Sequence, residues 1–208
     1  MKLGFIGAGA VAGAIARYAT AAGHEVILTS RHPEKVAALV SKLGKGASAG
    51  SLTEVADSDL VFLAVPWPNV ADALAGVPDW SGKILVDTTN PFVETSPKLV
   101  LADLGDKSAS EIVAAHAPGA RLVKAFNSIT MHNFEQGPRR GDAYRALLLS
   151  GDDTSAKKLD DTSAKKLVVS LIQSFGFKTI DMGDLATGGR LSQAGAPLAT
   201  GADRLIVQ

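Results

Sequence analysis

The chain has 208 residues, which is long enough for one α/β domain with its own core and too short for such a domain plus a large second one. The 21 lysines and arginines balance 21 aspartates and glutamates, so net charge recruits neither nucleic acid nor anionic lipid. No cysteine is present, which excludes disulfides, thiol catalysis and sulfur-ligated metals, and no apolar run approaches the ~18 residues of a membrane span. Because Met1 and Lys2 lead into a strand-like segment rather than a signal peptide, we expect a cytoplasmic protein without nucleic-acid or membrane partners.

Short apolar segments alternate with helical patterns from the first residues to about residue 181, as in parallel strands joined by crossover helices. The predicted strands are residues 2–7, 25–29, 47–48, 60–65, 83–88, 121–125, 145–149 and 178–181. The predicted helices are residues 10–22, 33–43, 69–75, 108–117 and 155–175.

This alternation predicts a Rossmann-type, doubly wound α/β fold, with a mostly parallel sheet and helices on both faces. We expect one compact domain over residues 1–208 with a short C-terminal extension. Residues 1–127 would form the core dinucleotide-binding part. Residues 128–208 would supply further strands, a helix, and a tail that wraps over the sheet or lines the site.

The octapeptide DDTSAKKL occurs twice in succession, at residues 152–159 and 160–167. Identity this strict indicates a recent tandem duplication or an artefact. Because a helix has ~3.6 residues per turn, the two copies would face about 80° apart. We expect the second copy to pack on the sheet, since it leads into the apolar residues 167–172, and the first to be solvated. Either Asp–Thr pair is a candidate cap for the helix.

The first predicted strand ends in a G-x-G-x-x-A string that opens an alanine-rich helix, residues 7–12. Gly7 permits a tight turn, Gly9 lets the backbone approach a pyrophosphate, and the small Ala12 allows close packing of helix on strand. Ala10 and Val11 begin the helix, whose positive end favours phosphate. Strand and helix around the string make a dinucleotide site far more probable than an ordinary turn.

The end of the second predicted strand distinguishes the two nicotinamide cofactors. NAD enzymes usually place an acid there, about 20 residues beyond the glycines, to bind the ribose hydroxyls. Here the chain reads Thr29, Ser30, Arg31 instead. Ser30 can hydrogen-bond a 2′-phosphate, Arg31 can bind it with two N–H groups, and Lys35 can add a contact one helical turn later. The sequence therefore favours NADP(H).

Three later strand ends carry proline or asparagine on the edge where open parallel sheets bind ligands. We expect them to form the walls of the nicotinamide site, although such residues also end strands without any ligand role. The candidate cofactor contacts there are Ala64, Val65, Pro66, Asn90, Pro91, Ala125, Phe126 and Asn127.

Other chemistries fit the sequence less well. Ser48 lies in a G-x-S-x-G string, but no strong strand precedes it, so a hydrolase nucleophile is disfavoured. The histidines at positions 24, 32, 116 and 132 lack metal-ligand spacing, and we assign no metal. His132, near a predicted strand end, is the one candidate substrate contact among them. No carboxylate pair or Lys–Tyr arrangement stands out for acid–base catalysis.

Further motifs accompany the glycine loop and the Ser30 and Arg31 pair. They are residues 23–26, 65–67, 87–91, 123–127, 151–153, 176–177 and 181–185. On these motifs the chain resembles the NADPH-dependent oxidoreductases that act on the deazaflavin coenzyme F420. It also resembles the oxidoreductase domain of membrane metalloreductases that pass NADPH electrons to a flavin. The likeness extends to residue 193; the departures are Ala12, where many members have glycine, and the duplicated octapeptide.

The resemblance implies direct hydride transfer from NADPH to a stacked ring, with F420, FMN or FAD as the small-molecule acceptor. Two rings held about 3–3.5 Å apart need no acid–base residue, so we assign no catalytic side chain. A homodimer is also implied. The side chains expected to face the rings are Pro66, Trp67, Asn90, Phe126, Asn127, Ile129 and Met131. Trp67, Ile129 and Met131 are the candidate substrate contacts among them.

Two alternative functions stay open at this point. One is an NADPH-dependent imine or carbonyl reductase, although such relatives usually add a long C-terminal helical domain for which this chain lacks the length. The other is a non-catalytic module that binds or senses NADPH, since hydride transfer between stacked rings leaves no residue signature.

Overall fold

The computed structural model describes residues 1–152, 163–199 and 203–207. The strands are β1 Lys2–Ile6, β2 Glu25–Thr29, β3 Ala47–Ala49, β4 Leu60–Leu63, β5 Ile84–Asp87, β6 Phe92–Glu94, β7 Val100–Leu101, β8 Arg121–Ala125, β9 Arg139–Arg140, β10 Ala143–Gly151, β11 Lys178–Asp181 and β12 Leu205–Ile206. The α-helices are α1 Ala10–Ala21, α2 Pro33–Leu43, α3 Leu52–Ala56, α4 Val70–Ala75, α5 Ala109–His116, α6 Met131–Glu135, α7 Ala164–Ser174 and α8 Arg190–Ser192. A 3₁₀ turn covers Trp67–Asn69, and a π-helical turn covers Leu185–Gly189.

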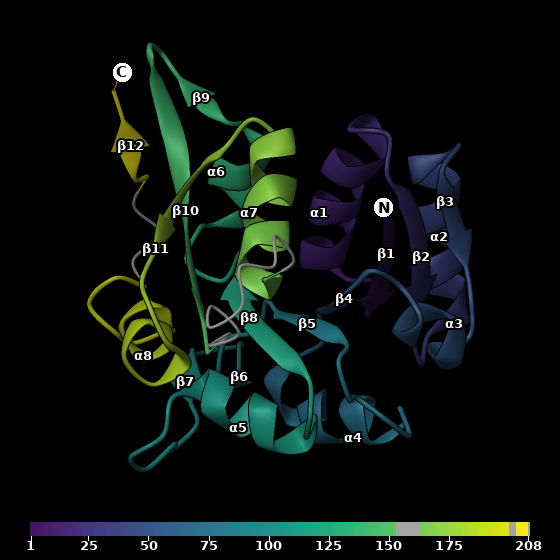
Figure 1. The fold of residues 1–208 in the computed structure, drawn as a ribbon, viewed down its shortest axis with the longest axis horizontal. Coiled ribbons are helices and arrows are strands. Elements are labelled where there is room, and N and C mark those ends of the chain that lie inside the picture. The colour runs from purple at the N-terminus through teal and green to yellow at the C-terminus, as the bar shows by residue number, and fades with distance from the viewer. Residues whose placement is uncertain (153–162, 200–202, 208) are drawn as a thin grey trace.

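The central sheet has the strand order β3-β2-β1-β4-β5-β8-β10-β11, with β9 and β12 paired to β10. The six strands from β3 to β8 are all parallel. β10 runs antiparallel to β8, while β11 is parallel to β10. The small hairpin β6–β7 stands apart from this sheet (Figure 1). The predicted Rossmann-type fold with a mostly parallel sheet is therefore confirmed.

Helices cover both faces of the sheet, and each face has its own apolar core. Leu3 and Phe5 of β1 belong to the core under α1 and α7, where Tyr18 packs against Phe175 with ring centroids 5.6 Å apart. Ile6 of β1 belongs to the core under α3, α4 and α5. Successive strand residues point to opposite faces, so one apolar run fills both cores. Figure 1 shows α1 and α7 across one face of the sheet.

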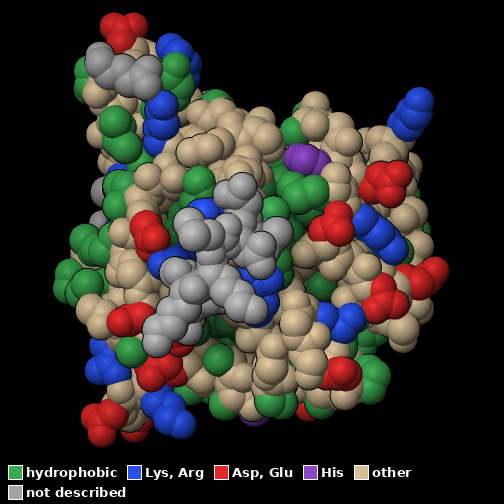
Figure 2. Space-filling model, viewed as in Figure 1, with side chains coloured by type: hydrophobic (Ala, Val, Ile, Leu, Met, Phe, Trp, Pro, Cys, Tyr) green, Lys and Arg blue, Asp and Glu red, His purple; other side chains and the backbone are tan. Residues whose placement is uncertain are grey.

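All eight predicted strands are present, three of them with the predicted ends and five with ends shifted by at most two residues. The sequence did not predict α3, α6, α8, the β6–β7 hairpin, β9 or β12. α3 has an N-terminal signature all the same, because Ser51 and Glu54 form a capping box. In Figure 2, acidic and basic side chains are interspersed over the right-hand part of the face drawn, in keeping with the balanced charge.

The second copy of the duplicated octapeptide leads into α7 and packs as expected. Ser163 caps the helix by accepting a hydrogen bond from the Lys166 amide; both threonines of the candidate Asp–Thr caps lie outside the described residues. Ala164 is fully buried, and Lys165 pairs with Asp181 at 3.0 Å. The first copy, apart from Asp152, lies outside the described residues, as does the start of the helix predicted over 155–175.

The chain after β11 is held to the sheet by buried polar contacts. Arg145 of β10 donates to both carboxylate oxygens of Asp203, at 2.8 and 3.2 Å, and to the carbonyls of Gly137 and Arg139. Arg204 donates to the Ser128 carbonyl at 2.8 Å. These contacts carry the tail back over the end of β8. None of the helices in the described part of the chain is long and apolar enough to span a bilayer.

Candidate functional site

The loop between β1 and α1 is shaped by its two glycines in different ways. Gly7 has φ +123°, and a Cβ built on it would lie 2.1 Å from the Ala64 carbonyl oxygen. Any side chain at this position would therefore clash with the end of β4. A Cβ on Gly9 would meet nothing within 4 Å, so the space in front of it is open to a ligand. Gly7 is therefore required by the fold, whereas Gly9 leaves space for a ligand to approach the backbone.

The first turn of α1 is arranged to receive an anion. Gly9 is its N-cap residue, no side chain accepts from the first amides, and the first turn carries no acidic residue. The unpaired N–H groups and the helix dipole concentrate positive potential there. Ala12 is fully buried, so the helix start is fixed close to the sheet. These are the features that bind a pyrophosphate at a helix start.

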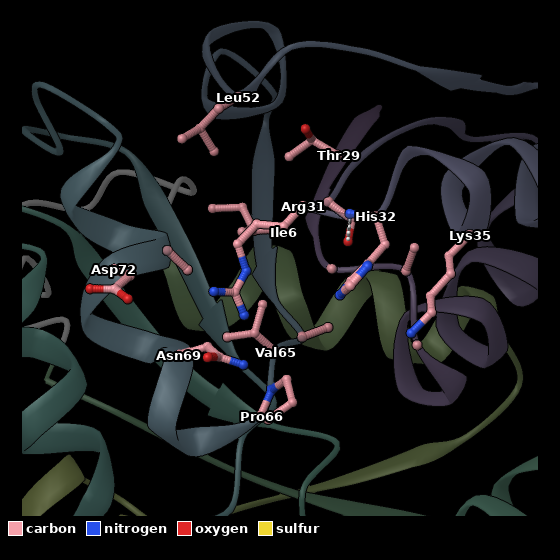
Figure 3. Close-up of a pocket in the computed structure, with 16 residues that line it drawn as sticks. Ile6, Thr29, Arg31, His32, Lys35, Leu52, Val65, Pro66, Asn69 and Asp72 are labelled. Carbon is pink, nitrogen blue, oxygen red and sulfur yellow. Dashed lines mark hydrogen bonds between the residues drawn. The ribbon is translucent and has the colours of Figure 1, made fainter.

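A cavity of about 450 Å³ opens in front of this loop, at the carboxyl ends of β1, β2 and β4. Figure 3 shows its lining. The residues that line it are Ile6, Gly7, Ala8, Gly9, Thr29, Ser30, Arg31, His32, Lys35, Leu52, Ala64, Val65, Pro66, Asn69, Asp72 and Ala73. The structure thus brings the glycine loop, the Ser30 to Lys35 segment and the end of β4 into one pocket.

Arg31 and Lys35 stand on different sides of this pocket. In Figure 3 the Arg31 side chain extends across it toward Asn69, and Lys35 lies beyond His32 on the other side. Both side chains are exposed. The Ser30 hydroxyl oxygen accepts a hydrogen bond from the His32 amide at 3.2 Å, which fixes the turn that follows β2. The pocket lining also contains one carboxylate, that of Asp72.

The ends of β5 and β8 form a second part of the crevice, held together by asparagine side chains. The Asn90 amide group donates to the Asn127 carbonyl at 2.9 Å, and its oxygen accepts from the Ala194 amide at 3.0 Å. Asn127 donates to the Ser192 carbonyl at 2.7 Å. Its side-chain oxygen is buried and has no partner among the described residues. The tail after β11 therefore packs against the ends of β5 and β8.

Asn90, Pro91, Ala125, Phe126 and Asn127 do not line the 450 Å³ cavity. The expectation that the Phe126 ring faces a ligand is wrong. Phe126 has φ +65° and is 2% exposed, and its ring packs edge-on against Phe62 and Phe134 inside the core. The left-handed backbone turns the side chain away from the crevice. Only the backbone of Phe126 is therefore available at the end of β8.

The three candidate substrate contacts are all packed against a core. Trp67 packs against the apolar core under α4, and Ile129 and Met131 pack against the core under α1. His132 is exposed and lies 2.9 Å from the Gln136 amide nitrogen.

The first three residues of α1, which the sequence assigns to cofactor binding, do not line the cavity with their side chains. Ala10, Val11 and Ala12 are absent from the lining, although they directly follow Gly9, which is part of it. Their contribution to the site is therefore the position of their backbone at the helix start.

A buried ion pair, which the sequence did not predict, joins the ends of β5 and β8. Lys124 donates to Asp87 at 2.9 Å and to the Thr89 carbonyl at 2.8 Å, and both charged side chains are at most 1% exposed. The Ser110 hydroxyl donates to the same Asp87 oxygen at 2.6 Å. Burial acts to raise the pKa of Asp87, but the Lys124 ammonium and the surrounding hydrogen bonds outweigh it and hold this pKa below its usual value.

This pair positions the loop that leads to Asn90. Asp87 and Lys124 are direct neighbours in the parallel register of β5 and β8. A charged residue inside each of two apolar strands was the available signal, because such residues are almost never buried unpaired. To predict that these two residues pair, one must know that β5 and β8 are neighbours in the sheet, and the sequence does not show this.

Eight residues that line the 450 Å³ cavity were not among the candidate contacts: Ile6, Ala8, Thr29, His32, Leu52, Asn69, Asp72 and Ala73. Leu52 reaches the cavity because the Ser51 and Glu54 capping box starts α3 immediately before it. Asn69 and Asp72 reach it from the 3₁₀ turn and the first turn of α4. Among the described residues, no group of three or more His, Cys, Asp or Glu side chains is arranged to hold a metal ion.

Comparison with known proteins gives matches over the first half and over almost the whole chain. Residues 2–91 match the family model described as NADP oxidoreductase, coenzyme F420-dependent. The structure of a hypothetical protein from Sinorhizobium meliloti is 34% identical, covers 99% of this chain and 96% of that one, and superposes with a TM-score of 0.86. A protein of Arthrobacter sp. FB24 assigned as an F420-dependent NADP-reductase is 27% identical, over 92% of this chain and 89% of that one, with a TM-score of 0.73.

The metalloreductase STEAP3 of Rattus norvegicus is 29% identical over 186 residues, which are 89% of this chain and 34% of the relative. The chain thus spans about a third of the length of this curated relative. The family model, the Arthrobacter structure and the metalloreductase agree with the glycine loop and the pocket described above. The chain is thus similar to coenzyme F420-dependent NADP oxidoreductases over residues 2–91, and to an NADP-reductase and a metalloreductase over most of its length.

Proposed function

We propose that this NADP-dependent oxidoreductase transfers a hydride between NADP(H) and a flavin or deazaflavin acceptor. The observation that carries the proposal is the 450 Å³ cavity, which joins the uncapped start of α1 to Ser30 and Arg31. The pocket offers an anion site made of backbone groups and, beside it, a cation at the end of β2. An NADP(H) molecule needs both, because it carries a pyrophosphate and a separate 2′-phosphate.

The residues present fit this cofactor. The pyrophosphate would lie against Gly9 and the first amides of α1, because Gly9 has no Cβ that would block its approach to the backbone. Ser30 and Arg31 would bind the 2′-phosphate, with Lys35 on the far side of His32 as a weaker contributor. The nicotinamide end would then extend along the strand ends toward Asn90 and Asn127. There the buried Asn127 oxygen, which has no partner among the described residues, is an acceptor suited to a carboxamide N–H.

The acceptor is inferred from the family and from relatives of stated activity. The family model and the Arthrobacter relative name coenzyme F420, and the rat relative is a metalloreductase. When bound, NADPH supplies a hydride from C4 of its ring, and the acceptor ring takes up this hydride and one proton from water. The protein's part is to hold the two rings face to face at about 3–3.5 Å and to exclude other orientations.

The acceptor is tested by following NADPH absorbance at 340 nm with F420, FMN, FAD and a cyclic imine in separate assays. We expect oxidation with F420 or a flavin and none with the imine. Oxidation with the imine alone would establish an imine reductase instead. Tight NADPH binding without oxidation by any acceptor would establish a binding module and contradict the proposal.

The cofactor contact is tested with Arg31→Ala. Loss of a hydrogen bond to a charged group should weaken NADPH binding by about 1.5–3 kcal/mol and leave NADH binding unchanged. Lys42→Ala is the matched control, because Lys42 is exposed on the neighbouring helix α2 but does not line the cavity. Titration calorimetry measures both cofactors. Equal losses for NADPH and NADH would rule out a role for Arg31 at the 2′-phosphate.

A further inference from the structure

A second cavity of about 330 Å³ is bordered by Pro91, in the segment that follows β5. One wall is the segment between β7 and α5, and the other is the tail around α8 (Figure 1). The residues that line it are Pro91, Leu101, Ala102, Asp103, Leu104, Gly105, Lys107, Arg190, Gln193, Ala194, Gly195 and Ala196. None of the residues assigned to cofactor binding lines it except Pro91.

Two cations face this cavity from opposite walls. Lys107 comes from the segment before α5, and Arg190 from the start of α8; both are exposed. Within the described residues neither side chain has an ion-pair or hydrogen-bond partner. The one carboxylate in the lining, that of Asp103, accepts a hydrogen bond from the Gly105 amide at 3.0 Å. The lining therefore has one net positive charge, with one ammonium and one guanidinium group available to an anion.

The remaining lining is partly apolar, through Pro91, Leu101, Ala102 and Leu104. Leu101 is 41% exposed, and its neighbours Leu99 and Val100 are exposed as well, so apolar surface continues from the cavity wall along β7. A cavity with an apolar wall and two cations suits a ligand that has an apolar part and an anionic end. It does not suit a bare inorganic ion, which would leave the apolar wall uncovered.

The cavity adjoins the crevice where the nicotinamide end of the cofactor is expected. Pro91 directly follows Asn90, and Ala194 donates its amide to the Asn90 side chain. Gln193 is fixed by accepting from the Ala109 amide at 2.8 Å. The second cavity therefore borders the segment that follows β5, whereas the first lies at the ends of β1, β2 and β4.

We propose that this second cavity binds the phosphate-bearing chain of the acceptor, with Lys107 and Arg190 as the phosphate contacts. Flavin and deazaflavin coenzymes combine a flat ring with a polyol chain whose terminal oxygen bears a phosphate group, which is free in FMN and esterified further in FAD and F420. A ring stacked near Asn90 and Asn127 would direct this chain toward Pro91 and the apolar wall, and its phosphate toward the two cations. The inference rests on the proposed function, since it takes the acceptor to be a flavin or deazaflavin.

The test compares acceptors with and without phosphate by direct binding to the protein saturated with NADP⁺. The probes are FMN against riboflavin, and coenzyme F420 against its phosphate-free deazaflavin core, each followed by fluorescence. The variant is Lys107→Gln with Arg190→Gln, and the control is Lys45→Gln with Lys42→Gln, which removes two exposed cations outside the cavity. Thermal unfolding and NADP⁺ affinity check that each protein is intact.

For at least one of the two pairs, we expect the unchanged protein to bind the phosphate-bearing member about tenfold more tightly or better, and the double variant to lose this preference. Binding of the phosphate-free member should stay the same in all three proteins. Equal affinity for both members of each pair, equal losses in the variant and the control, or no binding of any probe would overturn the inference. Phosphate-dependent binding without NADPH oxidation would instead contradict the proposed function and leave the phosphate site standing. NADPH oxidation by an acceptor without any preference for the phosphate-bearing member would support the proposed function and contradict the phosphate site.

Discussion

The two parts of the crevice are built by different means. At the ends of β1 and β2, the backbone forms the site, through the turn at Gly7, the open space at Gly9 and the amides of α1. At the ends of β5 and β8, side chains form it, through the Asp87 and Lys124 pair and the asparagine contacts. The first kind of site depends on residues within a short stretch of chain. The second depends on contacts between distant segments.

This difference has an energetic consequence. A backbone site tolerates changes in most side chains and fails at one or two positions where no Cβ fits. A site braced by buried charges fails when either partner is removed, because the remaining charge stays buried without compensation. The predictions below test whether the two parts of the crevice respond in these two ways.

The largest effect is expected for Lys124→Met, which leaves the Asp87 carboxylate buried without its ammonium partner. The free energy of unfolding should fall by about 3–5 kcal/mol in urea titrations. Addition of Asp87→Asn to this variant should recover part of the loss, since it removes the unpaired charge. Lys83→Met breaks a more exposed pair, with 25% and 64% of the two side chains exposed, and should cost at most about 1 kcal/mol. If both lysine variants lose the same free energy of unfolding, burial of the Asp87 and Lys124 pair does not increase its contribution to stability.

The glycine loop is tested by comparing Gly7→Ala with Gly9→Ala. At Gly7, the φ of +123° alone should cost about 1–3 kcal/mol of stability, and the contact with the Ala64 carbonyl adds to it. At Gly9, stability should be unchanged, because a Cβ there meets nothing within 4 Å. NADPH binding should nevertheless weaken about tenfold, because the methyl group occupies the approach of the pyrophosphate. Thermal unfolding and calorimetry measure the two quantities, and a stable Gly7→Ala protein would contradict the strain argument.

The smallest effect concerns acid stability of the tail. The hydrogen bonds from Arg145 are the main reason that the pKa of Asp203 lies below its usual value. A carboxyl with a lowered folded-state pKa contributes stability above its unfolded pKa of about 3.9, and this contribution is lost as the pH falls through the folded value. Asp203→Asn should therefore lower stability by about 1.5 kcal/mol at pH 7 and by less at pH 3, in urea titrations at both values. If Asp203→Asn lowers the free energy of unfolding equally at pH 7 and pH 3, the charge of the Asp203 carboxylate does not contribute to stability.

The sequence predicted the parts of the molecule that depend on local rules. Strand and helix periodicity gave the sheet, and the spacing from Gly7 to Arg31 gave the first cavity, because both reflect neighbours along one β-α-β unit. It did not predict the partner of Asn127, because Ser192 lies 65 residues away in a tail with weak periodicity. The ring of Phe126 was misplaced for another reason. A single left-handed residue reverses the direction of a side chain, and nothing in the residue type announces it.

The clash that a side chain at Gly7 would make with Ala64 also bears on how cofactor preference can change during evolution. Under the proposed function, the backbone loop around Gly7 and Gly9 would bind the pyrophosphate, which both nicotinamide dinucleotides share, and the conformation of this loop depends on the packing of β1 against β4. Under the proposed function, discrimination is left to the six exposed or half-exposed positions 30–35, which contribute little to either core. Exchange of this short segment alone would then convert the cofactor choice while the scaffold is inherited unchanged.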